Sequence, residues 1–249
     1  RALIESLRLH QWAKNLLIFV PLLLSGKIQS SEAWSLCFLG FMAWGLLASS
    51  TYLLNDLWDR PFDRGHWSKW QRPIARGDLP TFVALMVVPV GLAVSFGIAA
   101  SIDHGAAIIL AAYAALTLTY SLRLKRVPIL DVFVLAVLFT MRLCFGIALA
   151  DVPPSSWLLV FSMFIFMSLS LAKRFTEVAR NGALGRDKVE GRGYVSKDGP
   201  LLFGLGLSTA AGAVLIIVAI AVSSTMGSSK EAQLREGQSM AIGAYTLTF

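Results

Sequence analysis

The sequence has few charged residues and very little histidine or cysteine. Of its 249 residues, 15% are charged, three are His and two are Cys. So small a share of charged side chains is not that of an ordinary soluble domain. Cys37 and Cys144 both fall within apolar stretches, so no disulfide framework is indicated. The three histidines lack the spacing of zinc ligands, which argues against a zinc site.

Long apolar runs are abundant instead. Hydrophobic residues make up 56% of the chain, and its mean hydropathy is +0.66. Five runs contain no Asp, Glu, Lys or Arg: residues 33–55, 79–102, 104–122, 152–172 and 199–229. Each meets the requirement of roughly 20 residues for crossing the hydrocarbon core of a bilayer. These runs predict an integral membrane protein.

Two further spans are expected, one at residues 127–150 and one at residues 15–26. The first contains Asp131 and Arg142 as its only charged residues, and Lys14 and Lys27 can lengthen the second by snorkelling. Residues 239–249 open an eighth apolar segment of two or three helical turns, too short to cross a bilayer. We expect the chain to be incomplete at the C-terminus, and its start at Arg1 is compatible with missing residues at the N-terminus.

The basic residues indicate how the chain is oriented. The N-terminal segment and the loops at 56–78, 123–130 and 173–198 carry 18 of the 22 Lys and Arg residues. By the positive-inside rule, this basic side is cytoplasmic. The formal net charge of +7 then reflects topology and anionic ligands or lipid headgroups. Nucleic-acid binding is not expected, because the basic residues are dispersed over membrane loops without interleaved stacking aromatics.

The most informative motif follows the second span, at residues 55–64 (NDLWDRPFDR). On a helix, Asp56, Asp59 and Asp63 project within a narrow sector, with Asn55 beside them. Carboxylates placed so close together repel unless cations share the site. Oxygen ligands in a half-open array suit Mg²⁺, whose coordination is commonly completed by substrate phosphates. The motif therefore predicts a magnesium site for a diphosphate.

A less specific interpretation is a solvated helix end whose acids balance Arg60 and Arg64, because short acidic motifs are common. The surroundings favour the functional interpretation. Candidate phosphate-binding residues follow at once: Arg64, His66, Lys69, Arg72 and Arg76. Pro61 disfavours a regular helix at this point, so we expect Asp63 to approach from a loop.

Five local signatures resemble the UbiA superfamily of membrane prenyltransferases. They are residues 10–15 (HQWAKN), 55–64 running into 72–77 (RPIARG), 120–125 (YSLRLK), 173–177 (KRFTE) and 191–194 (GRGY). The likeness is strongest to the branch of decaprenyl-phosphate phosphoribosyltransferase and of related proteins fused to a haloacid-dehalogenase-like domain. It implies an all-α, polytopic bundle of the UbiA type, with about eight spans present of a nine-helix fold truncated at the C-terminus.

The resemblance also implies a Mg²⁺-dependent transferase in a bacterial plasma membrane, with its active site on the cytoplasmic side. Implied partners are the membrane, a polyprenyl lipid and a diphosphate-bearing substrate, together with a fused or associated haloacid-dehalogenase-like domain. The resemblance is also compatible with an oligomer. One departure concerns the loop after the sixth span, where other members carry a second D-x-x-x-D motif. This loop offers only Asp187 and Glu190, which lowers the expectation of two-metal allylic diphosphate chemistry.

The remaining charged residues leave alternatives open. Arg142 and Asp131 should both face the bundle interior without pairing, and Arg142 either contacts a polar substrate group or hydrogen-bonds backbone carbonyls. Lys173 and Glu177 have the spacing of a helix ion pair, but Lys14, Lys125 and Lys173 can also converge on a lipid phosphate. Tyr194 is either a lid hydroxyl or an interfacial aromatic anchor.

The predicted roles are as follows. Catalysis is assigned to Asp56, Asp59, Asp63 and Lys173, metal binding to Asn55, Asp56, Asp59 and Asp63, and substrate binding to Lys14, Asn55, Arg64, Lys69, Arg72, Lys125, Arg142, Arg174 and Tyr194. The leading hypothesis is transfer of phosphoribosyl from phosphoribosyl diphosphate to a polyprenyl phosphate. The alternatives are prenyl transfer from a polyprenyl diphosphate to an aromatic or other polar acceptor, and a non-enzymatic transporter or lipid-binding protein.

Overall fold

The computed structural model describes residues 2–64, 69–189, 191–235, 240–242 and 245–247. Its long helices are α3 (Ser31–Arg64), α5 (Thr81–Ile102), α6 (His104–Leu122), α7 (Leu130–Ala150), α8 (Ser156–Ala183) and α9 (Gly199–Arg235). Shorter α-helices are α1 (Ala2–Leu7), α2 (Val20–Leu24) and α4 (Pro73–Arg76), and 3-10 helices are η1 (Leu9–Phe19), η2 (Lys27–Gln29), η3 (Lys69–Gln71), η4 (Leu124–Arg126) and η5 (Ser196–Asp198). The fold is an all-α bundle, as predicted.

Six helices among the described residues are long and apolar enough to cross a membrane. They are the six long helices named above, and they contain six of the seven predicted spans. The seventh predicted span, residues 15–26, belongs to a shorter apolar segment, Leu9–Leu24. This segment is divided into the 3-10 helix η1 and α2, with Pro21 in the first turn of α2, where the missing N–H costs no helical hydrogen bond.

Helix α3 continues through Pro61 to Arg64, so the expectation that Asp63 approaches from a loop is wrong. Pro61 lies in the last turns of the helix, where breaking one backbone hydrogen bond disturbs little of the structure that follows. Asp63 consequently stays on the same helix as Asp56, and both side chains are buried.

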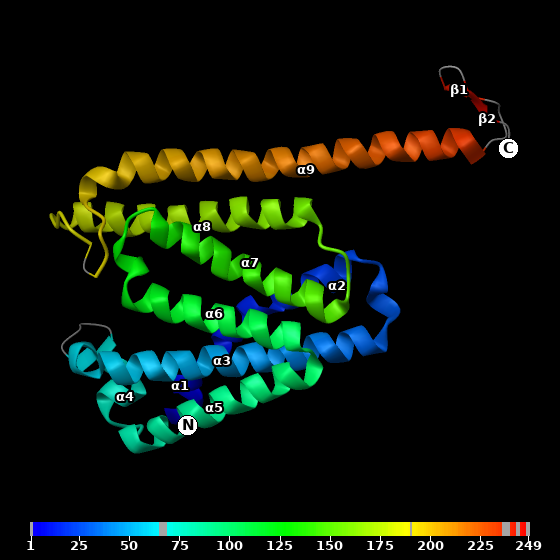
Figure 1. The fold of residues 1–249 in the computed structure, drawn as a ribbon. Helices are drawn as coiled ribbons and strands as arrows, with labels where there is room; N and C mark the ends of the chain where they lie inside the picture. The colour runs from blue at the N-terminus through cyan, green and yellow to red at the C-terminus, as the bar shows by residue number, and fades with distance from the viewer. Residues whose placement is uncertain (1, 65–68, 190, 236–239, 243–244, 248–249) are drawn as a thin grey trace.

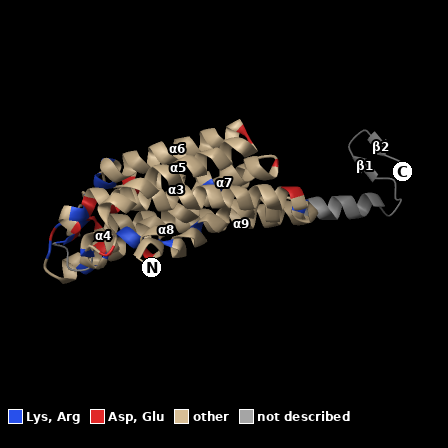
Figure 2. Cartoon of the chain, turned by 90° about the horizontal axis from the view of Figure 1, so that it is seen from below, with Lys and Arg blue, Asp and Glu red and all other residues tan. Residues whose placement is uncertain are grey.

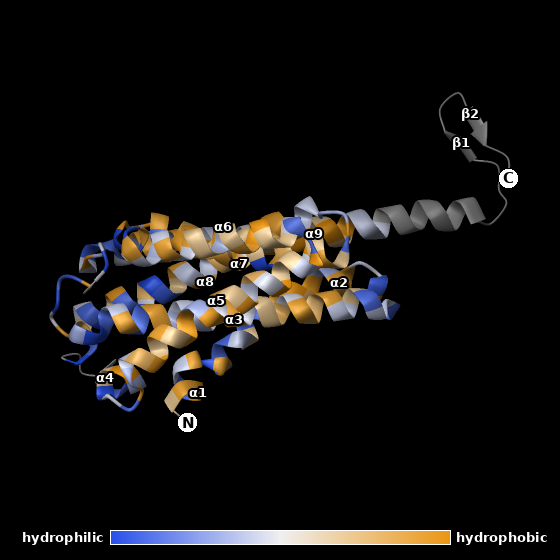
Figure 3. Cartoon of the chain, turned by 60° about the horizontal axis from the view of Figure 1, so that its bottom comes forward, coloured by the Kyte–Doolittle hydropathy of each residue, from blue (hydrophilic) through white to orange (hydrophobic). Residues whose placement is uncertain are grey.

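The long helices lie side by side, with α9 packed along α8 at one edge of the bundle (Figure 1). Hydrophobic residues dominate the sides of the bundle, whereas hydrophilic residues gather at its ends (Figure 3). Most Lys and Arg residues gather at the end that carries α4, which we call the basic end (Figure 2). This distribution agrees with the predicted placement of the basic loops on one side, and it is typical of an integral membrane protein.

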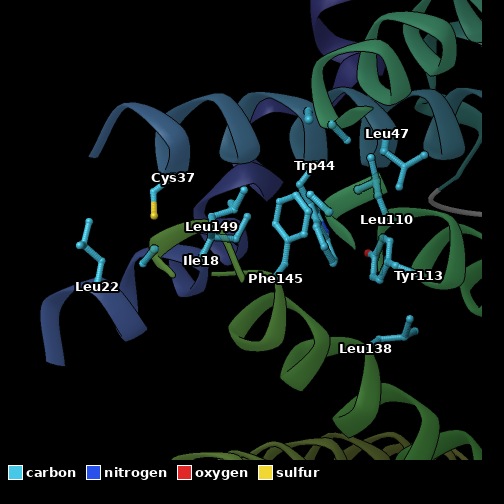
Figure 4. Close-up of a cluster of buried hydrophobic side chains, with 14 of the residues drawn as sticks. Ile18, Leu22, Cys37, Trp44, Leu47, Leu110, Tyr113, Leu138, Phe145 and Leu149 are labelled. Atoms are coloured by element: carbon cyan, nitrogen blue, oxygen red, sulfur yellow. The ribbon is translucent and has the colours of Figure 1, made fainter. Parts of the chain in front are cut away.

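The core combines aliphatic side chains with a few aromatic rings and holds the N-terminal segment against the bundle (Figure 4). Trp44 of α3 lies between Tyr113 of α6 and Phe145 of α7, with ring centroids 4.4 and 4.9 Å apart. The backbone of Ile18 in η1 lies so close to Gly146 of α7 that a side chain at position 146 would collide with its carbonyl group. These contacts fix η1, and hence the residues just before it, relative to α3 and α7.

The described residues near the C-terminus form strands. β1 (Met240–Ile242) pairs antiparallel with β2 (Tyr245–Leu247). The expectation of an eighth helical segment at residues 239–249 is therefore wrong for these six residues. Ile242, Tyr245 and Thr246 are residues that favour extended strands, and so short a segment gains little from forming an isolated helix.

Candidate functional site

Four charged side chains meet at the basic end of α3. Nη2 of Arg8 donates to both carboxylate oxygens of Asp56, at 2.7 and 2.9 Å. Nη1 of Arg72 donates to Asp56 at 3.0 Å and to Asp63 at 2.7 Å. The two acids are 2–3% exposed, whereas each arginine side chain is 26% exposed. Two buried carboxylates are thus balanced by two guanidinium groups that still reach water.

Arg8 was not among the predicted site residues. It joins α1 to η1 with a left-handed backbone (φ 51°, ψ 48°), which turns the chain at this point. Its guanidinium also lies 5.1 Å from the ring centroid of Tyr52, one turn before Asp56 on α3. The only sequence signal was its place two residues before the HQWAKN signature, because no local pattern predicts a left-handed arginine.

These groups border a cavity of about 340 Å³, which we call the acidic cavity. Its polar lining consists of Arg8, Asn55, Asp56, Asp59, Arg72, Ser121, Lys125 and Arg126, and its less polar lining consists of Tyr52, Leu54, Trp58, Leu118 and Leu122. Lys125 and Arg126 come from η4, a different element from the one that carries the acids. The cavity therefore combines oxygen ligands, cations and an apolar wall at the level where the helices end.

Five of the predicted residues meet in the acidic cavity: Asn55, Asp56, Asp59, Arg72 and Lys125. Asp63 is connected to it through Arg72. Arg64 instead donates to the carbonyl of Ala75 at 3.1 Å, which ties α4 to the end of α3. Lys14, Lys173, Arg174, Arg142 and Tyr194 do not line this cavity. The predicted phosphate contacts of His66 and of the Lys69 side chain lie outside the described residues.

The residues that line the acidic cavity suit a magnesium ion whose coordination shell is completed by oxygens of the substrate. The part of the chain that the structure describes contains no group of three or more His, Cys, Asp or Glu residues able to hold a metal. Mg²⁺ does not need such a cage, since it commonly takes one or two carboxylates, several waters and substrate phosphates. Asp56, Asp59 and the amide oxygen of Asn55 line the acidic cavity and match that donor set, and a metal ion would share the oxygens of Asp56 with Arg8 and Arg72.

A second acid–arginine network lies between α7, α8 and the 184–198 loop, and we call it the buried network. Asp131 of α7 is fully buried, and its Oδ2 lies 3.2 Å from Nε of Arg174 and 3.3 Å from Nη1 of Arg192. Arg174 also pairs with Glu177, which in turn lies 3.5 Å from Arg192. Glu177 thus pairs with these two arginines, while Lys173, its predicted alternative partner, is exposed.

Tyr194 belongs to the buried network. Its ring is 1% exposed, so the expectation of an interfacial anchor is wrong. Its hydroxyl donates to Asp131 and accepts the backbone N–H of Ile129 at 2.8 Å. Burial and the hydrogen bond to Asp131 raise the pKa of Tyr194, so the hydroxyl stays protonated and donates. The structure makes it a tie between the 184–198 loop and the start of α7, and a contact with substrate stays a prediction.

Arg142, like Arg174, is a buried cation. Its guanidinium donates to Oδ1 of Asn15 at 3.1 Å, to the carbonyl of Leu138 at 2.6 Å and to the hydroxyl of Tyr113 at 2.9 Å. Arg142 and Asp131 are both buried and have different partners, as predicted. The bond to Leu138 is the hydrogen bond to a backbone carbonyl that the structural alternative expects, and a contact of Arg142 with substrate stays a prediction.

Fold and site together define an integral membrane protein with an acidic, arginine-bearing cavity at the basic end of a helical bundle. Residues 16–222 match the model of the UbiA prenyltransferase family. Because that match covers most of the chain, this protein belongs to the UbiA prenyltransferase family, as its sequence signatures predicted.

Several curated proteins are similar to this chain. It is 43% identical over 215 residues to the uncharacterized protein y4nM of Sinorhizobium fredii and 34% identical over 216 residues to nodulation protein NoeC of Azorhizobium caulinodans. It is 33% identical over 195 residues to decaprenyl-phosphate phosphoribosyltransferase of Mycolicibacterium smegmatis. These alignments cover 86%, 86% and 76% of this chain, but 42%, 69% and 61% of the respective relatives. This chain thus corresponds to part of the length of each relative.

Two solved structures share the fold. A UbiA homolog from Archaeoglobus fulgidus bound to GPP and Mg²⁺ superposes with a TM-score of 0.69 at 17% identity, over 90% of this chain and 78% of the other. The apo structure of a UbiA homolog from Aeropyrum pernix K1 gives a TM-score of 0.56 at 20% identity, over 87% and 77%. At these identities the likeness establishes the fold alone.

Proposed function

We propose that this protein transfers a phosphoribosyl group from phosphoribosyl diphosphate to a polyprenyl phosphate in the presence of Mg²⁺, on the cytoplasmic side of a bacterial membrane. The observation that carries the proposal is the acidic cavity, which is lined by Asp56 and Asp59 from α3 and by Lys125 from η4. The names of the phosphoribosyltransferase relatives support the choice of donor. The excess of Lys and Arg at the basic end supports the cytoplasmic placement.

The acidic wall would hold the diphosphate end of the donor. Asn55, Asp56 and Asp59 would hold Mg²⁺, which supplies positive charge for the departing diphosphate. Arg72 is fixed by Asp63 and Asp56, so its remaining N–H groups are positioned for phosphate oxygens without further ordering. Asp63 thus acts as a positioning residue for Arg72.

The part of the cavity that is lined by α6 and η4 suits a lipid phosphate. Lys125 and Arg126 can pair with the phosphate, while Leu118, Leu122 and Trp58 offer apolar surface to the first prenyl units. A phosphate monoester is anionic at neutral pH, so no strong general base is required. One of its oxygens attacks the anomeric carbon, a new C–O bond forms, and the bond from that carbon to the diphosphate breaks with its electron pair going to the diphosphate. Positioning by the residues that line the cavity provides much of the catalysis.

Prenyl transfer from a polyprenyl diphosphate is the second candidate, because solved relatives of the same fold bind GPP or DMAPP with Mg²⁺. The two candidates differ in which substrate carries the diphosphate. A fused or associated haloacid-dehalogenase-like domain and an oligomeric state stay predictions.

A lipid-extraction assay separates the candidates. Membranes containing this protein are incubated with Mg²⁺, a polyprenyl phosphate and phosphoribosyl diphosphate labelled in the ribose. We expect the label to enter the lipid extract, to disappear with a chelator, and to be lost in Asp59→Asn but not in Asp78→Asn, whose exposed carboxylate pairs with Arg76 outside the cavity. Prenyl transfer without any ribose label in the lipid would overturn the proposal in favour of the second candidate.

A further inference from the structure

A second cavity, of about 400 Å³, adjoins the acidic cavity. Its lining consists of Glu5, Ser6, Arg8, His10, Gln11, Asp56, Gln71, Arg72 and Pro73. Among the residues that the structure describes, the two cavities share only Arg8, Asp56 and Arg72. The Arg8–Asp56–Arg72 ion pairs therefore stand at the junction between them. We call the second space the polar cavity.

The two cavities differ in the residues that line them. Eight of the nine described residues that line the polar cavity carry hydrogen-bonding or charged side chains, and the ninth is Pro73. The described lining of the acidic cavity, by contrast, includes the apolar side chains of Leu118 and Leu122. A prenyl chain in the polar cavity would take these polar groups out of water without replacing their hydrogen bonds, which is unfavourable. A hydrated occupant with hydroxyl groups would instead keep these hydrogen bonds.

The arginines that line the polar cavity indicate that its occupant also carries an anionic group. Arg8 and Arg72 each use one terminal nitrogen on the acids of α3, which leaves further N–H donors on each guanidinium. Glu5, Gln11 and Gln71 supply acceptors and donors of the kind that bind sugar hydroxyls. Guanidinium donors beside amide and carboxylate groups match a phosphorylated sugar.

We infer that the polar cavity binds the pentose and the 5-phosphate of the donor, while the acidic cavity binds its diphosphate. This inference rests on the proposed function. The anomeric carbon, whose bond to the diphosphate breaks, then lies at the junction marked by Arg8, Asp56 and Arg72. The polar cavity becomes the element that selects a phosphoribosyl donor over a prenyl donor, since only the former has a second phosphate and hydroxyl groups to place there.

Two probes test the two cavities separately on the purified full chain in detergent. Ribose 5-phosphate lacks the diphosphate, and Mg²⁺ with inorganic diphosphate lacks the sugar. Isothermal titration calorimetry measures the binding of each. We expect Gln11→Leu to weaken ribose 5-phosphate binding about threefold to tenfold through the lost hydrogen bonds. The same variant should bind Mg²⁺–diphosphate as the parent does, which also shows that it is folded. Asp59→Asn should weaken the binding of Mg²⁺–diphosphate and leave the binding of ribose 5-phosphate unchanged.

The matched control is Gln29→Leu, the same change at an exposed residue of η2 at the far end of the bundle. It should alter neither titration. Ribose 5-phosphate that fails to bind the parent, or that binds Gln11→Leu and Gln29→Leu equally well, overturns the inference while leaving the proposed function intact if Mg²⁺–diphosphate still binds. If the parent binds neither probe, both the inference and the proposed function fail.

Discussion

The acidic cavity and the buried network use the same residue types for different ends. In both, aspartates of a long helix pair with arginines from other elements, near the basic end of the bundle. The arginines at the acidic cavity are 26% exposed, whereas Arg174 of the buried network is 2% exposed and Asp131 is fully buried. Arg192 and Glu177, which are 23% and 32% exposed, lie on the outer side of the buried network. An ion pair that borders an open cavity can exchange partners with a ligand, whereas the sealed Asp131–Arg174 pair holds α7 against α8. The exposure of the arginines that pair with the buried aspartates therefore distinguishes the acidic cavity from the Asp131–Arg174 pair.

The largest effect is expected from breaking the buried Asp131–Arg174 pair. Asp131→Asn leaves Arg174 with only the partly exposed Glu177 as an acidic partner, so the loss of stability should approach the cost of breaking a buried pair, about 3–5 kcal/mol. The free energy of unfolding of the purified protein in mixed micelles measures it. Asp187→Asn, at an exposed position of the 184–198 loop, is the control and should change stability by less than about 0.5 kcal/mol. Equal stabilities of the two variants would contradict a structural role for the buried network.

At the acidic cavity the expected loss is in turnover and not in stability. Asp59 is half-buried and lines the cavity, so Asp59→Asn should lower Mg²⁺-dependent transfer by about 100-fold or more while the protein unfolds as before. Initial rates of label transfer into lipid give the comparison. If Asp59→Asn retains full activity, the acidic wall has no part in binding the diphosphate.

A smaller effect is expected at Tyr194. Tyr194→Phe removes the hydroxyl that joins Asp131 to the backbone of Ile129, and an unsatisfied buried partner costs about 1–3 kcal/mol. Hydrogen exchange of the 184–198 loop should quicken, because the loop loses its tie to α7. Unchanged exchange in this loop, with Tyr194→Phe as stable as the parent, would show that the hydroxyl is not the tie.

The smallest effect is expected on the basic wall of the acidic cavity. Lys125→Ala should raise the concentration of polyprenyl phosphate needed for half-maximal rate by about tenfold, because one charge-assisted hydrogen bond to the lipid phosphate is lost. Arg123→Ala removes a neighbouring exposed charge that does not line the cavity, and it should change this concentration little. If both variants behave alike, the general positive charge of the basic end accounts for lipid binding, and Lys125 has no particular role.

The sequence predicted the membrane bundle and much of the acidic wall because both depend on local pattern. Apolar run length located six of the seven spans, and helical spacing placed Asn55, Asp56 and Asp59 together. The continuation of α3 through Pro61 was not predictable from propensity alone, since buried contacts such as Asp63 with Arg72 stabilise the last turn.

Long-range partners were the harder part to predict. Arg8 reaches Asp56 only because a left-handed residue joins α1 to η1, and no pattern in the sequence indicates that turn. The pairing of Asp131 with Arg174 and Tyr194 depends on how α7, α8 and the following loop pack together. The residue types alone do not indicate this packing, and they led to the prediction that Arg174 and Tyr194 contact substrate. The exposure of the paired arginines, which distinguishes the acidic cavity from the Asp131–Arg174 pair, depends on the packing of the whole bundle.

The central claim is that Asp56 and Asp59 hold a divalent ion that binds diphosphate. Its most direct test is electron paramagnetic resonance of Mn²⁺ titrated into the purified protein, with and without inorganic diphosphate. The account predicts a bound Mn²⁺ signal that strengthens with diphosphate, is lost in Asp56→Asn and in Asp59→Asn, and persists in Asp78→Asn. Mn²⁺ binding that is the same in all three variants would contradict it.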